Sequence, residues 1–129
     1  MAVQRISTGS PFEKQAGYSR AIKDAEWVHV AGTTGYNYET MTMPDDVAAQ
    51  AENCFETIEK ALQEAGSSLC DVVRARYYIT DPFYADQVFE VTGKYFGEVR
   101  PAATMVVAGL IKPEMKIEIE VTARIGAGA

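Results

Sequence analysis

The longest run of regular hydrophobic spacing in the chain predicts a helix from about Asp45 to Ala65. Apolar residues recur every three or four positions, which places them on one face of a helix. That face consists of Val47, Ala51, Phe55, Ile58, Leu62 and Ala65. The other faces carry glutamates expected to meet solvent, namely Glu52, Glu56, Glu59 and Glu64. Pro44-Asp45-Asp46 supplies a negatively charged N-terminal cap, and Gly66 ends the helix.

A second helix is expected from near Pro82 to Phe96, with Asp81 as its cap and a proline at its first position. Gly97 ends it. Its buried side is predicted from residues at helical spacing, which are Val88, Val91 and Tyr95, with Phe83 or Tyr84.

Alternating apolar and polar residues predict strands. They are Trp27–Ala31, ended by Gly32, then Val72–Thr80, Thr104–Leu110 and Met115–Arg124. We expect Thr104–Leu110 to pair with the last strand as a hairpin through Lys112-Pro113-Glu114. The resulting order, β-β-α-β-α-β-β, predicts an α+β sandwich with two helices on one face of a mostly antiparallel or mixed sheet. The residues 1–129 are expected to form a single domain.

The sheet face without helices is predicted to be polar. It carries Arg74, Arg76, Tyr78, Glu118 and Glu120. This mixture of opposite charges is too polar for a core, which leaves two interpretations. The face is either solvated or, as we prefer, a subunit interface in which charges pair and clefts form between protomers.

Composition limits the partners. The chain is 47% hydrophobic and 23% charged, as in soluble globular proteins, and its formal net charge of −6 disfavours nucleic acid. No window approaches ~18 consecutive apolar residues, so we expect no membrane span. Residues 1–10 lack the apolar core of a signal peptide. Cys54 and Cys70 suit a reducing compartment, although a disulfide between them stays open, and we expect a cytoplasmic protein.

An ordered set of short motifs matches a known family. The set comprises Asp46-Val47-Ala48-Ala49-Gln50-Ala51, Glu64-Ala65-Gly66, Asp71-Val72-Val73, Arg100-Pro101-Ala102 and Lys116-Ile117-Glu118-Ile119-Glu120. With these motifs the chain resembles the Rid family, also called YjgF, reactive-intermediate deaminase or endoribonuclease L-PSP. The resemblance implies a chorismate-mutase-like fold with a six-stranded mixed sheet and two helices on one face. It also implies a homotrimer with three clefts between adjacent subunits.

For the deaminating branch of that family, the resemblance implies hydrolysis of enamines and imines such as 2-aminoacrylate to a keto acid and ammonia. An arginine clamps the substrate carboxylate, a glutamate positions the attacking water, and a tyrosine and a Ser-Gly pair complete the pocket. Carried over residue by residue, the tyrosine is Tyr18, the glutamate is Glu118 and the glycine is Gly32. Two positions depart from the pattern, because Ala31 replaces the serine and Ala103 replaces the arginine.

The change at Ala103 bears most directly on function. Arginine binds a carboxylate through paired, charge-assisted hydrogen bonds, and alanine makes none. Losing such a bond costs ~1.5–3 kcal/mol, so efficiency on an anionic imino acid is expected to fall at least ~tenfold. Phe89 and Met105 are expected to line a more apolar pocket, suited to a neutral or aromatic ligand.

Other residues keep two interpretations each. Glu118 is either a general base toward water or a structural ion-pair residue. Arg76, Arg100 and His29 are candidates to replace the missing cation, and each is also explained as an interface or structural residue. Tyr18 is either a pocket wall or a surface aromatic. Tyr36 and Tyr38 lie in a loop that is either a lid or plain surface.

The sequence therefore supports a small-molecule hydrolase or deaminase without an arginine clamp, and the alternative is a non-catalytic metabolite-binding trimer. Ribonuclease activity is disfavoured by the acidic charge and the lack of a basic aromatic stripe. No nucleotide loop, metal-ligand cluster or haem motif is recognised, so we expect no cofactor and no metal. The expected partners are a second and third copy of the chain and a small-molecule ligand.

Overall fold

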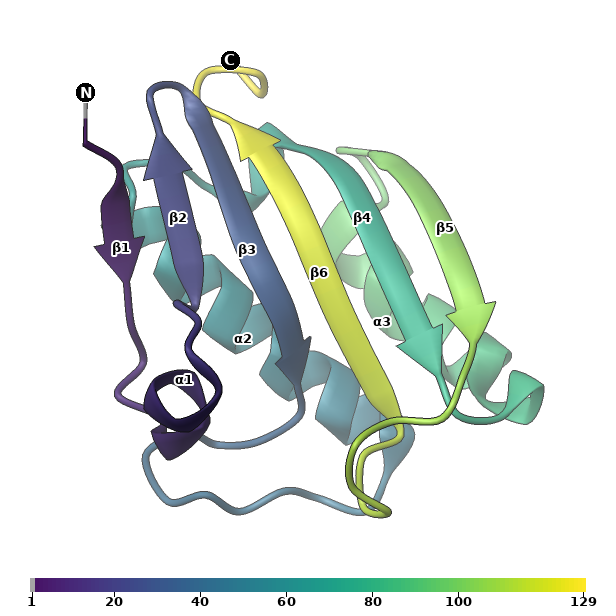
Figure 1. The fold of residues 1–129 in the computed structure, drawn as a ribbon. Coiled ribbons are helices and arrows are strands. Elements are labelled where there is room, and N and C mark those ends of the chain that lie inside the picture. The colour runs from purple at the N-terminus through teal and green to yellow at the C-terminus, as the bar shows by residue number, and fades with distance from the viewer. Residues whose placement is uncertain (1) are drawn as a thin grey trace.

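The computed structural model describes residues 2–129 as an open six-stranded mixed sheet with two long helices against one face (Figure 1). The strands run in the order β1-β2-β3-β6-β4-β5, and every neighbouring pair is antiparallel except β4 and β5. They are β1 (Gln4–Ile6), β2 (Ala21–Asp24), β3 (Trp27–Thr34), β4 (Val72–Ile79), β5 (Ala102–Val107) and β6 (Ile117–Arg124). The helices are α1 (Pro11–Ala16), α2 (Val47–Glu64) and α3 (Ala85–Phe96). The predicted α+β class is confirmed, with β1 and the short α1 added at the N-terminal end.

Helix α2 forms the main layer over the sheet. The Asp46 side chain accepts a hydrogen bond from the backbone N–H of Ala49 at 2.9 Å and so caps the helix. All six apolar residues predicted for its inner face are buried. Phe55 stacks on Tyr95 of α3, with ring centroids 4.4 Å apart, which joins the two helices. The chain leaves α2 through Gly66, whose φ of +82° favours glycine.

The expected hairpin between Thr104–Leu110 and the last strand is wrong. Strand β5 pairs in parallel with β4 at the sheet edge, and β6 lies between β3 and β4. The reason lies in the crossover, since α3 returns the chain to the starting end of β4 and a parallel neighbour follows. Local alternation along Thr104–Leu110 identifies a strand but does not identify its neighbour.

The prediction that Gly32 ends an early strand is also wrong, because β3 continues to Thr34. Val30 pairs with Val121 and Thr33 with Ile119, so two residues of β3, Ala31 and Gly32, oppose the single residue Glu120. This is a β-bulge, and it returns Thr33 to the buried face while the strand goes on.

Two further details differ from expectation. The segment Pro82–Tyr84 is a 3₁₀ turn, and the α-helix begins only at Ala85. Tyr84 packs against the core, whereas Phe83 is 82% exposed. Cys54 is buried, Cys70 is exposed, and both thiols are free. No helix within residues 2–129 is both long and apolar enough to cross a membrane.

Candidate functional site

Glu118 lies on the sheet face without helices, on the central strand β6. Its backbone neighbours are Thr34 on β3 and Tyr78 on β4. The side chain is half-buried and leans over the bulge, because a Cβ built on Gly32 would overlap its carboxylate. The absence of a side chain at position 32 therefore makes the room that the Glu118 carboxylate occupies.

In the protein, the protonated form of the Glu118 carboxyl is more favoured than it is for a glutamate in water. Burial raises the pKa of this carboxyl above its ordinary value, and the negative charge of Glu120 adds to the rise. The positive charge of Arg20 opposes it. A carboxylate with a raised pKa is a stronger base, which suits proton abstraction from water near neutral pH.

Arg20 is the residue that sequence reasoning missed. It comes immediately before β2 and is fully buried. Its Nη1 donates hydrogen bonds to the Gly32 carbonyl at 2.8 Å and to the Thr33 hydroxyl at 2.9 Å. Arg20 therefore holds the bulge over which Glu118 lies. A single arginine between Ser19 and Ala21 carries no periodic signal, so only the strand pairing reveals it.

Tyr18 joins the same cluster through its hydroxyl. The Arg20 Nη2 donates to the Tyr18 oxygen at 3.2 Å, and the guanidinium carbon lies 5.4 Å from the Tyr18 ring centroid. The Tyr38 ring flanks the guanidinium as well, at 5.0 Å. Tyr38 thus covers Arg20, while Tyr36 is only 5% exposed and donates to Glu114, so Tyr36 is not a surface residue.

The other predicted pocket residues lie elsewhere in the chain. Ala103 and Met105 are on the edge strand β5, beside the helix-facing Ala75 and Tyr77 of β4. Ala103 and Met105 therefore face the helical side of the sheet, whereas Glu118 faces the opposite side. Strand β4 separates β5 from β6, which places the strands of the two groups about 10 Å apart. Phe89 is on α3, which packs on the helical side of the sheet (Figure 1), and is 53% exposed.

Arg20 links Tyr18 to the bulge at Ala31 and Gly32, over which Glu118 lies. The structure leaves three predicted residues apart from this set, namely Phe89, Ala103 and Met105. We call the first set, with Arg20, the glutamate half-site. We call the second set the edge half-site. The two half-sites do not form one pocket within a single chain.

The cations considered as replacements for an arginine at position 103 lie away from Glu118. Arg76 pairs in register with Glu120, whose carboxylate also accepts a 2.7 Å hydrogen bond from Tyr78. His29 is opposite Thr122, four residues along β6 from Glu118, or about 13 Å. Arg100 precedes β5 with a φ of 52° and is exposed. Among residues 2–129, the cation that acts on Glu118 is Arg20.

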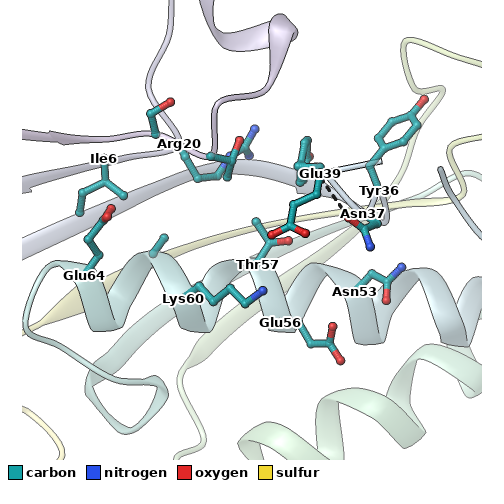
Figure 2. A pocket seen from close by; sticks show the side chains of 14 residues that line it. Ile6, Arg20, Tyr36, Asn37, Glu39, Asn53, Glu56, Thr57, Lys60 and Glu64 are labelled. Carbon is teal, nitrogen blue, oxygen red and sulfur yellow. Dashed lines mark hydrogen bonds between the residues drawn. The ribbon is translucent and has the colours of Figure 1, made fainter. Parts of the chain in front are cut away.

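Arg20 also lines a cavity of about 250 Å³ between α2, the end of β1 and the segment after β3 (Figure 2). Its lining includes exposed side chains of both signs, namely Glu39, Glu56, Lys60 and Glu64. None of the predicted site residues lines it. The cavity shares only Arg20 with the glutamate half-site. Because both acidic and basic side chains line it, the cavity favours neither an anionic nor a cationic ligand.

The architecture is that of an open α+β sheet with two helices on one face and a glutamate on the other. Among solved structures, a member of the YjgF/YER057c/UK114 family from Mycobacterium tuberculosis shares 42% identity and a TM-score of 0.87, covering 96% of this chain and all of that one. RidA from an Antarctic Psychrobacter shares 29% identity and a TM-score of 0.81, with 97% and 99% covered.

Sequence relationships agree with this architecture. The family model described as Endoribonuclease L-PSP matches residues 8–125. A RutC family protein of Pyrococcus abyssi is 34% identical over 124 residues, which are 95% of this chain and 98% of that protein. The chain belongs to the endoribonuclease L-PSP family, that is, the YjgF or Rid family. It carries alanine at position 103.

Proposed function

We propose that this protein hydrolyses an imine, an enamine or a related C–N substrate in clefts between the subunits of a homotrimer. The observation that carries the proposal is the half-buried Glu118, whose carboxylate lies over Gly32 on an otherwise polar sheet face. Its raised pKa suits a general base. Membership of the endoribonuclease L-PSP family supports this reaction class through the resemblance to its deaminating branch.

In the proposed reaction, water adds to the carbon of a C=N bond while Glu118 accepts a proton from that water. Glu118 then passes that proton to the substrate nitrogen, which gives the neutral tetrahedral carbinolamine and restores the Glu118 carboxylate. Return of the hydroxyl proton through Glu118 to the nitrogen then releases ammonia and leaves a carbonyl group. An imine and one water give a ketone or aldehyde and one ammonia, and an enamine enters this sequence after protonation at carbon.

The cleft is proposed to form between chains because each chain holds only half of it. The glutamate half-site has its own internal hydrogen bonds, whereas Ala103 on the edge strand β5 and Phe89 on α3 are exposed. A neighbouring subunit that brings its edge half-site to Glu118 would complete the pocket. Homo-oligomers with cyclic symmetry repeat such a contact at every interface.

We propose a neutral substrate because the edge half-site offers no cation. Ala103 makes no hydrogen bond to a carboxylate, and Phe89 and Met105 are apolar. Arg20 is fully buried behind Tyr18 and Tyr38, so it influences Glu118 by its charge and does not clamp a ligand. Compared with 2-aminoacrylate, its neutral carboxamide should therefore be the better substrate.

The decisive experiment compares ammonia release from 2-aminoacrylate and from 2-aminoacrylamide, each generated in place, by wild type and Glu118→Ala. We expect turnover of the carboxamide that Glu118→Ala reduces by ~10²–10⁴-fold without changing the oligomeric state. Equal turnover by both proteins would remove Glu118 from the mechanism. A wild type that binds the product pyruvamide but turns over neither substrate would favour the second candidate, a metabolite-binding trimer. That candidate is favoured by one observation, the missing arginine at position 103.

A further inference from the structure

Arg20 and Tyr18 share a hydrogen bond with an unusual consequence for the tyrosine. The Tyr18 oxygen accepts from Arg20 Nη2 at 3.2 Å. Within residues 2–129, the Tyr18 hydroxyl accepts a hydrogen bond and donates none. Because an arginine can only donate, this contact occupies a lone pair of the tyrosine and leaves the phenolic proton free.

The guanidinium is held firmly enough to impose this orientation. Three of its contacts are hydrogen bonds from the two Nη atoms to Gly32, Thr33 and Tyr18, and the Tyr38 ring covers it. Its Nε lies 4.0 Å from the Glu13 carboxylate, the only acidic group in ion-pair range of it among the described residues, and has no hydrogen-bond partner there. The Arg20 guanidinium is planar and fully buried, and its acceptors are held in place, so it has little freedom to rotate.

The charges around Tyr18 keep its proton in place at neutral pH. Burial raises the pKa of the Tyr18 hydroxyl, Arg20 opposes this, and the neighbouring Tyr38 and Glu13 add to the rise. Tyr18 is therefore a neutral donor, and it is 37% exposed, so a ligand can reach it.

We propose that Arg20 is a positioning residue, which accepts no ligand itself but directs the Tyr18 proton toward an acceptor atom of the substrate bound beside Glu118. The acceptor is the nitrogen of a neutral C=N group or a carbonyl oxygen next to it. This inference rests on the proposed function. It also gives the site a polar anchor in place of the arginine that position 103 lacks.

The test is a double-mutant cycle on Arg20→Gln and Tyr18→Phe, with 2-aminoacrylamide as substrate. We expect each single variant to lower kcat/KM by ~tenfold, the usual effect of one lost hydrogen bond. The double variant should lose clearly less than the product of the two single losses, because the part of the Arg20 effect that passes through the Tyr18 hydroxyl is already gone in Tyr18→Phe. The remaining loss reflects the contact of Arg20 with the Gly32 bulge and its charge near Glu118. An arginine that acts only on the bulge and on Glu118 would instead give fully additive losses, and that result would overturn the proposal.

A second readout does not depend on turnover. The ¹³Cζ resonance of Tyr18, assigned by its loss in Tyr18→Phe, reports the titration of this hydroxyl. Removing the positive charge in Arg20→Gln should move that titration to higher pH, and Arg20→Lys should restore part of the difference. An unchanged Tyr18 titration in folded Arg20→Gln protein would contradict the proposed contact, whether or not the protein proves to be an enzyme.

The matched control is Arg5→Gln, which removes an exposed arginine from β1 and should change neither readout. Arg20→Gln leaves Glu13 as a buried, unpaired charge, so the variant can lose stability. If it does not fold, Glu13→Gln combined with Arg20→Gln removes both charges and enters the same cycle. Turnover by none of the proteins, with the tyrosine titration shifted as expected, would reject the proposed hydrolysis and retain the Arg20–Tyr18 contact.

Discussion

The two half-sites are built in opposite ways. The glutamate half-site is internally bonded, since Arg20 links the bulge at Gly32 to Tyr18. The edge half-site has exposed Ala103 and Phe89 at the end of the sheet. In the first region hydrogen bonds join side chains to the backbone and to one another, and in the second region Ala103 and Phe89 are exposed.

This difference shows where specificity and chemistry can change independently. The charge and position of Glu118 depend on contacts within its own chain, namely burial, Glu120 and Arg20. The residue at position 103 contacts no part of that network, so arginine and alanine are interchangeable there without disturbing it. If the two half-sites meet between subunits as proposed, a change of substrate class needs little more than substitutions on the edge strand β5.

Mixing two inactive variants should give the largest effect. Glu118→Ala disables the glutamate half-site, and Ala103→Trp fills the space at the edge half-site, so each trimer alone should be nearly inactive toward 2-aminoacrylamide. In co-refolded mixed trimers, about a quarter of the clefts would combine an intact half-site from each neighbour, which should restore about a quarter of wild-type turnover. Activity that stays absent in verified mixed trimers would show that the half-sites do not meet across an interface.

Gly32→Ala should be the next most severe change. The new methyl group would overlap the Glu118 carboxylate and push it from its position. A displacement of about 1 Å at the reacting group can cost ~10²-fold, so we expect a loss of that order in kcat with the trimer intact. Gly109→Ala is the matched control, because a Cβ there meets nothing within 4 Å. Similar kinetics for both alanine variants would mean that Glu118 tolerates displacement.

Ala103→Arg should change specificity without changing the glutamate half-site. The paired hydrogen bonds of a guanidinium to a carboxylate should raise kcat/KM for 2-aminoacrylate at least ~tenfold relative to 2-aminoacrylamide. Steady-state kinetics on both substrates give this ratio directly. A ratio equal to that of wild type would indicate that position 103 does not face the substrate.

Glu120→Gln should produce the smallest effect, a displaced pH profile. The Glu120 charge raises the pKa of Glu118, so removing that charge lowers this pKa. A general base works in its ionised form. In a plot of kcat against pH, the rise on the acidic side should therefore move to lower pH, and the maximal kcat should stay unchanged. Glu26→Gln, an exposed change in the β2–β3 turn, should leave this rise in place. If the acidic side of the kcat profile moved to higher pH instead, a group other than Glu118 would be the one that titrates.

Local patterns in the sequence were sufficient for the two long helices and for the strands β3, β4, β5 and β6, whereas α1 and β1 were not predicted. The inner face of α2 and the alternation along β6 were predicted residue by residue, because side-chain periods of 3.6 and 2 follow directly from backbone geometry. The motifs from Asp46 to Glu120 also indicated the Rid family, and the placement of alanine at position 103 is a plain property of the sequence.

Only the tertiary structure decided which strands are neighbours and which side chains meet. The pairing of β5 with β4 depends on the path of the α3 crossover, and the bulge at Ala31-Gly32 depends on the register between β3 and β6. Arg20 became visible as the partner of Tyr18 and Gly32 only once β2 and β3 were paired. Contacts between residues distant in sequence arise from strand pairing and close packing, which no local period encodes.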